Sequence, residues 1–124
     1  MKNNFLKNIQ LKINNISRNK TIPIFFATDD NYIPYLEVAL RSLVENASKA
    51  YTYNIHILNT GLKEENKDAI LKLANKNFNI LFEDISYCIE PIKAMLKDVY
   101  HFSVVMYYRL FIEKLFPQYD KVIY

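Results

Sequence analysis

The sequence contains one glycine, Gly61, and no tryptophan among its 124 residues. With a single glycine, neither a G-x-G-x-x-G turn nor a Walker-type loop can form, so a bound phosphate must be held without a glycine cradle. The chain also has one cysteine, Cys88, which excludes an internal disulfide and favours a reducing compartment. Because Tyr87 and Ile89 flank it and no histidine lies near it in sequence, we predict a structural role for Cys88.

Long hydrophobic runs are missing as well. No apolar stretch reaches the roughly 18 residues of a membrane-spanning helix, and the start of the chain has no apolar core of a signal peptide. The overall composition is nevertheless that of a folded domain, with 51% hydrophobic and 23% charged residues. These values argue against disorder, and the length allows one domain.

Acidic residues are absent from the first 20 residues, which form a basic arm. This arm has a formal charge of +5, carried by Lys2, Lys7, Lys12, Arg18 and Lys20. The whole chain has a formal charge of +3, so residues 21–124 together carry −2. A mildly acidic domain does not present a basic nucleic-acid face, and we expect no nucleic-acid partner.

The arm also has an apolar side. Apolar residues recur every three to four positions, at Phe5, Leu6, Ile9, Ile13 and Ile16. This spacing predicts a short amphipathic helix, which can lie in the interface of an anionic membrane. The alternative is that the helix packs on its own domain or on a second copy of the chain. The expected location is cytoplasmic, with peripheral contact at the inner membrane face through residues 1–20.

Strand and helix patterns alternate from residue 21 onward. The expected strands are 22–27, 52–58, 78–82 and a fourth that begins at 121, and the expected helices are 34–46, 62–76, 91–97 and 102–116. Crossovers of this length predict an α/β domain with a parallel sheet and right-handed connections. We therefore divide the chain into the arm, residues 1–20, and one domain, residues 21–124, that stops within its fourth strand.

The loop after the first expected strand is the candidate ligand site. In open α/β sheets, ligands bind at the carboxyl ends of strands, where the strand order switches. Backbone groups of Ala27 and Thr28 can pair with a base edge, Asp29 can accept hydrogen bonds from a ribose or a base, and Tyr32 offers a ring for stacking. The alternative is that residues 29–31 are only a polar helix cap.

Two separated motifs carry a resemblance to a known family. They are IPIFFATDDNYIPYLEVALRSLVEN at residues 22–46 and YYRLFIEKLFP at 107–117, the latter followed by YDKVIY at 119–124. The segments IHIL at 55–58 and GLKEEN at 61–66 are compatible with the same pattern. Residues 21–124 thus resemble glycosyltransferase family 8, the bacterial lipopolysaccharide galactosyl- and glucosyltransferase group, whereas the basic arm is outside the resemblance.

The resemblance implies a fold and a reaction. The fold is a GT-A-like, Rossmann-type parallel sheet with flanking helices, here truncated in the fourth strand. The reaction is transfer of a hexose from a UDP-sugar donor to a saccharide or lipid-linked acceptor, with retention at the anomeric carbon. By position in the motif, the implied uridine contacts are Ala27, Asp29, Asn31 and Tyr32, beside Thr28.

Arg109, in the second motif, is implied to reach the diphosphate or the donor sugar. A guanidinium suits this role because it binds phosphate bidentately and keeps its charge. The alternative is a surface ion pair with Glu113, four residues further along a helix.

The resemblance also implies a Mn²⁺ or Mg²⁺ ion. Its ligands, an Asp-x-Asp pair just beyond the last strand and a later histidine, are absent from this sequence, so no metal ligand and no catalytic residue is assigned. We therefore expect the chain alone to be inactive in transfer. Two alternatives stay open: a uridine-nucleotide-binding module without catalysis, and a structural or interaction remnant whose exposed last strand pairs with another copy.

Overall fold

Three parallel strands form the sheet, in the order β1 (Thr21–Ala27), β2 (Thr52–Asn59) and β3 (Phe78–Asp84). The structure is a computed structural model that describes residues 21–96 and 103–124. In the register of the sheet, Ala27 lies opposite Leu58, which in turn lies opposite Glu83. The carboxyl ends of the three strands therefore meet at one edge, as the alternating pattern predicts.

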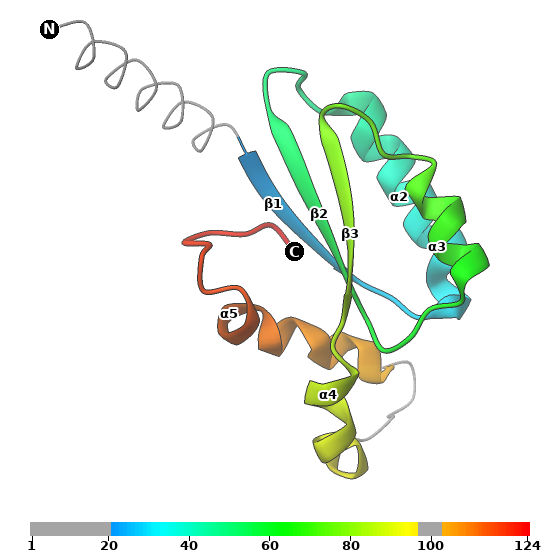
Figure 1. Cartoon of the computed structure of the whole chain (residues 1–124), viewed down its shortest axis with the longest axis vertical. Coiled ribbons are helices and arrows are strands. Elements are labelled where there is room, and N and C mark those ends of the chain that lie inside the picture. The colour runs from blue at the N-terminus through cyan, green and yellow to red at the C-terminus, as the bar shows by residue number, and fades with distance from the viewer. Residues whose placement is uncertain (1–20, 97–102) are drawn as a thin grey trace, which may run out of the picture.

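Helices cover both faces of this sheet (Figure 1). The crossover helices α2 (Ile33–Asn46) and α3 (Glu64–Leu71) lie on the same face, as right-handed connections between successive neighbours require. Of the elements that follow β3, three pack into the hydrophobic layer on the other face: α4 (Ser86–Ile89), the 3₁₀ helix η3 (Val104–Phe111) and α5 (Ile112–Leu115). The 3₁₀ helix η2 (Glu90–Met95), between α4 and η3, has no buried residue. The predicted α/β class with flanking helices is confirmed.

The central strand β2 supplies the middle of both hydrophobic layers. Successive side chains of a strand point to opposite faces. Ile55 and Ile57 are fully buried against α2 and α3, where Leu40 and Ile70 meet them. Leu58 is fully buried on the other face, beside Phe25 of β1. A strand buried on both sides explains the near-continuous apolar run in its sequence.

The segment after α5 returns to the outer edge of β1. The N–H of Phe25 donates to the carbonyl of Ile123 at 2.8 Å, and the N–H of Ile123 donates to the carbonyl of Pro23 at 3.0 Å. This is one isolated parallel bridge, not the strand expected from residue 121. The next hydrogen bond of this parallel ladder would join the N–H of residue 23 to the carbonyl of Lys121. Residue 23 is a proline and has no N–H, so this bond cannot form. Because the segment pairs on the side of β1 opposite β2, the strand order reverses at β1.

The helix after β2 is shorter than its sequence pattern suggests. The expected helix runs to Lys76, whereas α3 ends at Leu71. A tight turn replaces its last part: Asn75 and Phe78 exchange two backbone hydrogen bonds of 3.1 Å each, and the N–H of Asn77 donates to the Asn75 side chain at 2.9 Å. Asparagine side chains compete with helical hydrogen bonding in this way.

The helices on the second face are broken into short pieces. The short helix expected at 91–97 is the 3₁₀ helix η2, with Pro91 in its first turn. A further helix, α4, precedes it and begins at Ser86, whose N–H donates to Asp84 Oδ1 at 2.9 Å. The helix expected from Phe102 is, in its described part, η3 followed by α5. Val104 and Val105 open η3, and β-branched residues have low α-helix propensity.

Two predictions concern membranes and the lone cysteine. Within residues 21–96 and 103–124, every helix is too short or too polar to cross a bilayer. The amphipathic helix expected at residues 1–20 lies outside the described residues.

Cys88 is half-buried in α4 and packs against the second hydrophobic layer, which agrees with a structural role.

Asp30 ties the loop after β1 to the start of α3. Its Oδ1 accepts hydrogen bonds from the side-chain amide of Asn66 at 2.6 Å and from the N–H of Lys63 at 3.1 Å. These two hydrogen bonds hold the pKa of Asp30 below its ordinary value, with the bond from Asn66 the larger cause. The loop that follows β1 is thereby fixed relative to the neighbouring crossover.

The buried centre of β2 predicts a large loss of stability on truncation. We expect Ile57→Ala to lower the free energy of unfolding by about 2–5 kcal/mol, because the side chain is fully buried and leaves a cavity. Val38→Ala, on the exposed side of α2, is the control and should change it by less than about 0.5 kcal/mol. Urea unfolding measures both, and equal effects would contradict the assignment of the core.

The Asp30 contact predicts a specific pH dependence. A carboxyl whose pKa is lowered in the folded state stabilises it above the unfolded pKa, and this contribution disappears as the pH falls through the folded pKa. We therefore expect Asp30→Asn to destabilise the chain at neutral pH, by an amount that shrinks below the ordinary aspartate pKa of 3.8.

Unfolding by urea at a series of pH values measures this difference. Asp68→Asn replaces an exposed carboxylate on the same α3 helix and serves as the matched control. A destabilisation by Asp30→Asn that stays constant down to pH 2 would contradict the role given to the ionised carboxylate.

Candidate functional site

A cavity of about 400 Å³ opens at the carboxyl end of β1. Ala27 and Thr28 form its floor, and the two hydrophobic layers form its walls. On the α2 side the lining residues are Tyr32, Tyr35, Leu36 and Ala39, and on the η3 side they are Ser103, Val105 and Met106. The cavity thus lies where the strand order reverses, which is the position expected for a ligand in an open α/β sheet.

The cavity suits a flat, largely apolar group. Its lining is mostly apolar, and two tyrosines stand at its mouth with much of their surface open to solvent: Tyr32 is 53% exposed and Tyr35 is 71% exposed. Their ring centroids lie 5.8 Å apart and the rings are tilted by 45°. Exposed aromatic rings beside an apolar cavity are well placed to stack on a planar ligand.

Thr28 is part of the floor but has little free donor capacity. It is 2% exposed, its N–H donates to the carbonyl of Leu58 at 3.1 Å, and its hydroxyl donates to the carbonyl of Asp29 at 3.0 Å. The predicted pairing of the Thr28 backbone with a base edge therefore cannot use its amide. The hydroxyl oxygen keeps its acceptor lone pairs at the floor of the cavity.

Asp29 caps the short helix η1 (Asp30–Tyr32). Its Oδ1 accepts the N–H of Asn31 at 2.9 Å and the N–H of Tyr32 at 3.2 Å. The interpretation of this loop as a polar cap is thus confirmed, and the cap fixes the backbone from which the Tyr32 ring projects. Both bonds end on Oδ1. Among the described residues Oδ2 has no such partner, so it can accept a hydrogen bond from a hydroxyl or N–H of a ligand.

The predicted uridine contacts are only partly gathered around the cavity. Ala27, Thr28 and Tyr32 line it, whereas Asp29 and Asn31 lie in the adjoining loop and do not. Their contact with a uridine stays a prediction.

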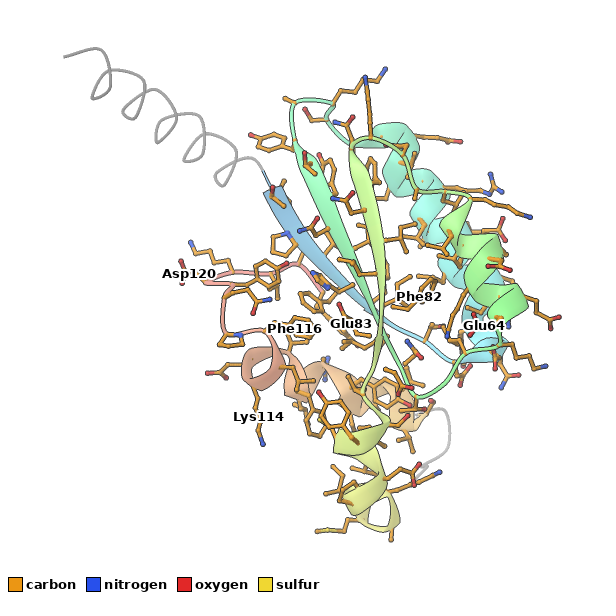
Figure 2. The ribbon with its side chains drawn as sticks, viewed as in Figure 1. Glu64, Phe82, Glu83, Lys114, Phe116 and Asp120 are labelled. Carbon is orange, nitrogen blue, oxygen red and sulfur yellow. The ribbon has the colours of Figure 1, made fainter. Side chains whose placement is uncertain are left out.

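Arg109 lies apart from these residues. It is exposed on η3 and lines a second cavity, of about 460 Å³, together with Tyr119 and Asp120 of the C-terminal segment (Figure 2 labels Asp120). Its guanidinium carbon is 6.0 Å from the centre of the Tyr124 ring. The alternative ion pair with Glu113 is not found among the ion pairs of the described residues.

The sequence analysis missed the η3 wall and the second tyrosine. Tyr35 follows Tyr32 by three residues, a spacing that places two side chains on the same side of a helix. That spacing could have identified it. Ser103 and Val105 precede the arginine motif and carry no comparable signal, because their approach to β1 depends on tertiary packing.

The divalent cation implied by the family resemblance does not fit the described residues. Across residues 21–96 and 103–124, no group of three or more histidine, cysteine, aspartate or glutamate side chains converges in a way that could hold a metal ion. No step is therefore assigned to a metal.

Comparisons with known proteins agree with the geometry. A protein-family model described as glycosyl transferase family 8 matches residues 23–124. A curated protein of Haemophilus influenzae (strain ATCC 51907 / DSM 11121 / KW20 / Rd), described as "Putative glycosyltransferase", is 30% identical over 106 residues, which are 85% of this chain and 31% of that protein. The chain thus spans about a third of the length of this relative. No solved structure matches.

Family membership follows from the extent of these matches. The family model covers most of the chain, including β1 from Pro23 onward, the loop that carries Tyr32 and the Arg109 motif. The matched residues also include β2, β3 and both walls of the cavity. The chain belongs to glycosyltransferase family 8.

Proposed function

We propose that this chain carries the donor-binding part of a glycosyltransferase that moves a hexose from a UDP-sugar to a saccharide or lipid-linked acceptor, with retention at the anomeric carbon. The observation that carries the proposal is the apolar cavity at the carboxyl end of β1, with the Tyr32 ring at its mouth. Family membership supplies the reaction class, and the cavity supplies a place for the base.

The uracil ring occupies the cavity in this proposal. It stacks on Tyr32, whose backbone is held by the Asp29 cap, and its polar edge faces the Thr28 hydroxyl oxygen. The free carboxylate oxygen of Asp29 accepts a hydrogen bond from the ribose or from a base N–H. The Tyr32 backbone, the Asp29 carboxylate and the Thr28 hydroxyl are each held by a hydrogen bond before the ligand arrives, which lowers the entropic cost of binding.

The diphosphate then extends along η3 toward Arg109. Met106 lines the cavity, and Arg109 follows it by three residues in the same 3₁₀ helix. Residues three apart in such a helix lie on one side, about 6 Å apart along the axis. Arg109 is thus one turn from Met106 along η3, and in this proposal its guanidinium binds the diphosphate bidentately.

A second candidate is a uridine-nucleotide-binding module without transfer. It is supported by the same apolar cavity and exposed Tyr32 ring, because binding of a base requires no residue outside them. Release of UDP from UDP-glucose and UDP-galactose, with Mn²⁺ and a saccharide acceptor, separates the two candidates. Release above the rate without protein supports transfer by this chain, whereas binding without release supports the module.

Removal of the Tyr32 ring tests the cavity. We expect Tyr32→Ala to weaken UDP binding by about 5- to 150-fold, since base stacking on an aromatic side chain contributes about 1–3 kcal/mol. Tyr51→Ala removes a comparably exposed tyrosine next to the amino end of β2 and is the matched control. Calorimetric titration measures both, and equal affinities for UDP would remove the cavity from the proposal.

Arg109 should distinguish the diphosphate from the nucleoside. We expect Arg109→Ala to weaken UDP binding by about 10- to 150-fold and to leave uridine binding unchanged, because hydrogen bonds to charged groups contribute about 1.5–3 kcal/mol. Arg41→Ala, an exposed arginine of α2 that pairs with Glu37, is the control. Equal losses for UDP and uridine would show that Arg109 acts on the fold and not on the diphosphate.

A further inference from the structure

His56 is a buried polar residue with no part in the proposed nucleotide site. It lies in the middle of β2 and is 4% exposed. Its ring stacks on Phe25, with centroids 4.6 Å apart and planes 13° apart, and it also contacts Phe116 at 5.1 Å. Figure 2 shows Phe116 and Glu83 on the side of the sheet that faces the C-terminal segment, whereas Phe82 points toward α2 and α3.

Both ring nitrogens of His56 are hydrogen-bonded to residues far away in the sequence. Nδ1 lies 2.8 Å from Glu83 Oε1 on β3, and Nε2 lies 2.9 Å from the Tyr119 hydroxyl, which follows α5. Glu83, His56 and Tyr119 therefore form one chain of hydrogen bonds from the edge strand, through the central strand, to the C-terminal segment.

The chemistry of the partners assigns the proton on Nδ1. An ionised carboxylate can only accept hydrogen bonds, so the nitrogen that faces Glu83 must carry the proton. In the neutral ring, Nε2 then has a free lone pair and must accept from the Tyr119 hydroxyl. Glu83 in this way sets the tautomer of His56, and the tautomer sets the direction of the bond to Tyr119.

Tyr119 begins the segment that returns to β1. Four residues later, Ile123 makes the two backbone hydrogen bonds to β1, and the Tyr124 ring lies beneath the guanidinium of Arg109. The described contacts of the segment with the sheet are few: the Tyr119 side chain at one end and the single bridge at Ile123 at the other.

We propose that the Glu83–His56–Tyr119 hydrogen-bond chain positions residues 119–124 and holds them in one register along the outer edge of β1. Packing alone does not require a histidine here, because Phe25 and Phe116 already surround the site with apolar rings. A buried imidazole must instead be hydrogen-bonded to avoid a desolvation cost. The bonds it forms fix Tyr119, and through Tyr119 the register of Ile123 against Phe25.

The placement of Tyr124 beneath Arg109 extends this role to the donor site, and that extension alone rests on the proposed function. His56 and Tyr119 are positioning residues in this scheme, since neither lines the cavity at the carboxyl end of β1. The tests below use no nucleotide, so their failure would overturn this positioning role and leave the proposed function standing.

Amide hydrogen exchange tests the alignment directly. We expect Tyr119→Phe, which keeps the ring and removes the hydroxyl, to speed exchange at Phe25 by about two- to tenfold relative to the amides of β2. Tyr53→Phe is the matched control, because it removes a tyrosine hydroxyl that donates to the Ser48 carbonyl at 3.1 Å on the opposite face of the sheet. Tyr53→Phe should leave the rate of amide exchange at Phe25, relative to the amides of β2, unchanged.

Nitrogen-15 NMR of the His56 ring tests the proton assignment. We expect the wild-type chain to carry a proton on Nδ1. Glu83→Gln, whose amide can accept from or donate to the ring, should keep both a hydrogen bond at Nδ1 and slow exchange at Phe25, whereas Glu83→Ala should lose the fixed tautomer and exchange faster at Phe25. Rescue by glutamine separates hydrogen-bond positioning from general loss of stability. A wild-type ring protonated on Nε2 alone, or unchanged Phe25 exchange in Tyr119→Phe, would overturn the proposal.

Discussion

Parallel pairing of β2 with both of its neighbours is the constraint on which the rest of the molecule depends. The pairing runs without offset from Thr21 and Thr52 at one end to Asn59 and Asp84 at the other. Parallel neighbours must be joined by crossovers, and two successive right-handed crossovers place α2 and α3 on one face. The rest of the chain is left to cover the opposite face and to return beside β1. The cavity exists because this return reverses the strand order there.

The loop after β1 divides its polar side chains between structure and recognition. Asp29 holds the backbone amides of the next turn, and Asp30 holds the start of α3. Both carboxylates therefore have internal partners, and together they fix the segment from which Tyr32 projects. Asp29, which sequence reasoning left between a cap and a ligand contact, acts as a cap with one of its carboxylate oxygens, and its contact with a uridine stays a prediction.

The strands were predictable because their signal is local. Alternating or continuous apolar residues bounded by polar turns marked residues 22–27, 52–58 and 78–82 to within two residues of the observed ends. The helix ends were less predictable. At Asn75 a side chain formed a turn that helical periodicity does not record.

The candidate site followed the same division between local and tertiary signals. Ala27, Thr28 and Tyr32 follow directly from the position of β1, so a general rule for α/β sheets found them. The η3 residues approach β1 only in the folded chain, and His56 meets Tyr119 from 63 positions away in the sequence, so no local pattern contains either contact. Arg109 was found through its motif, and its separation from the cavity is a fact of packing.

Pro23 gives the outer side of β1 a property that matters beyond a single molecule. A row of unpaired amides at a sheet edge is a template on which another chain can add a strand. On this side of β1, the carbonyl of Pro23 is bonded to Ile123, and its nitrogen has no hydrogen to offer. An intruding strand would therefore find an interrupted row of donors, so the proline protects β1 against non-native strand addition and the aggregation that follows from it.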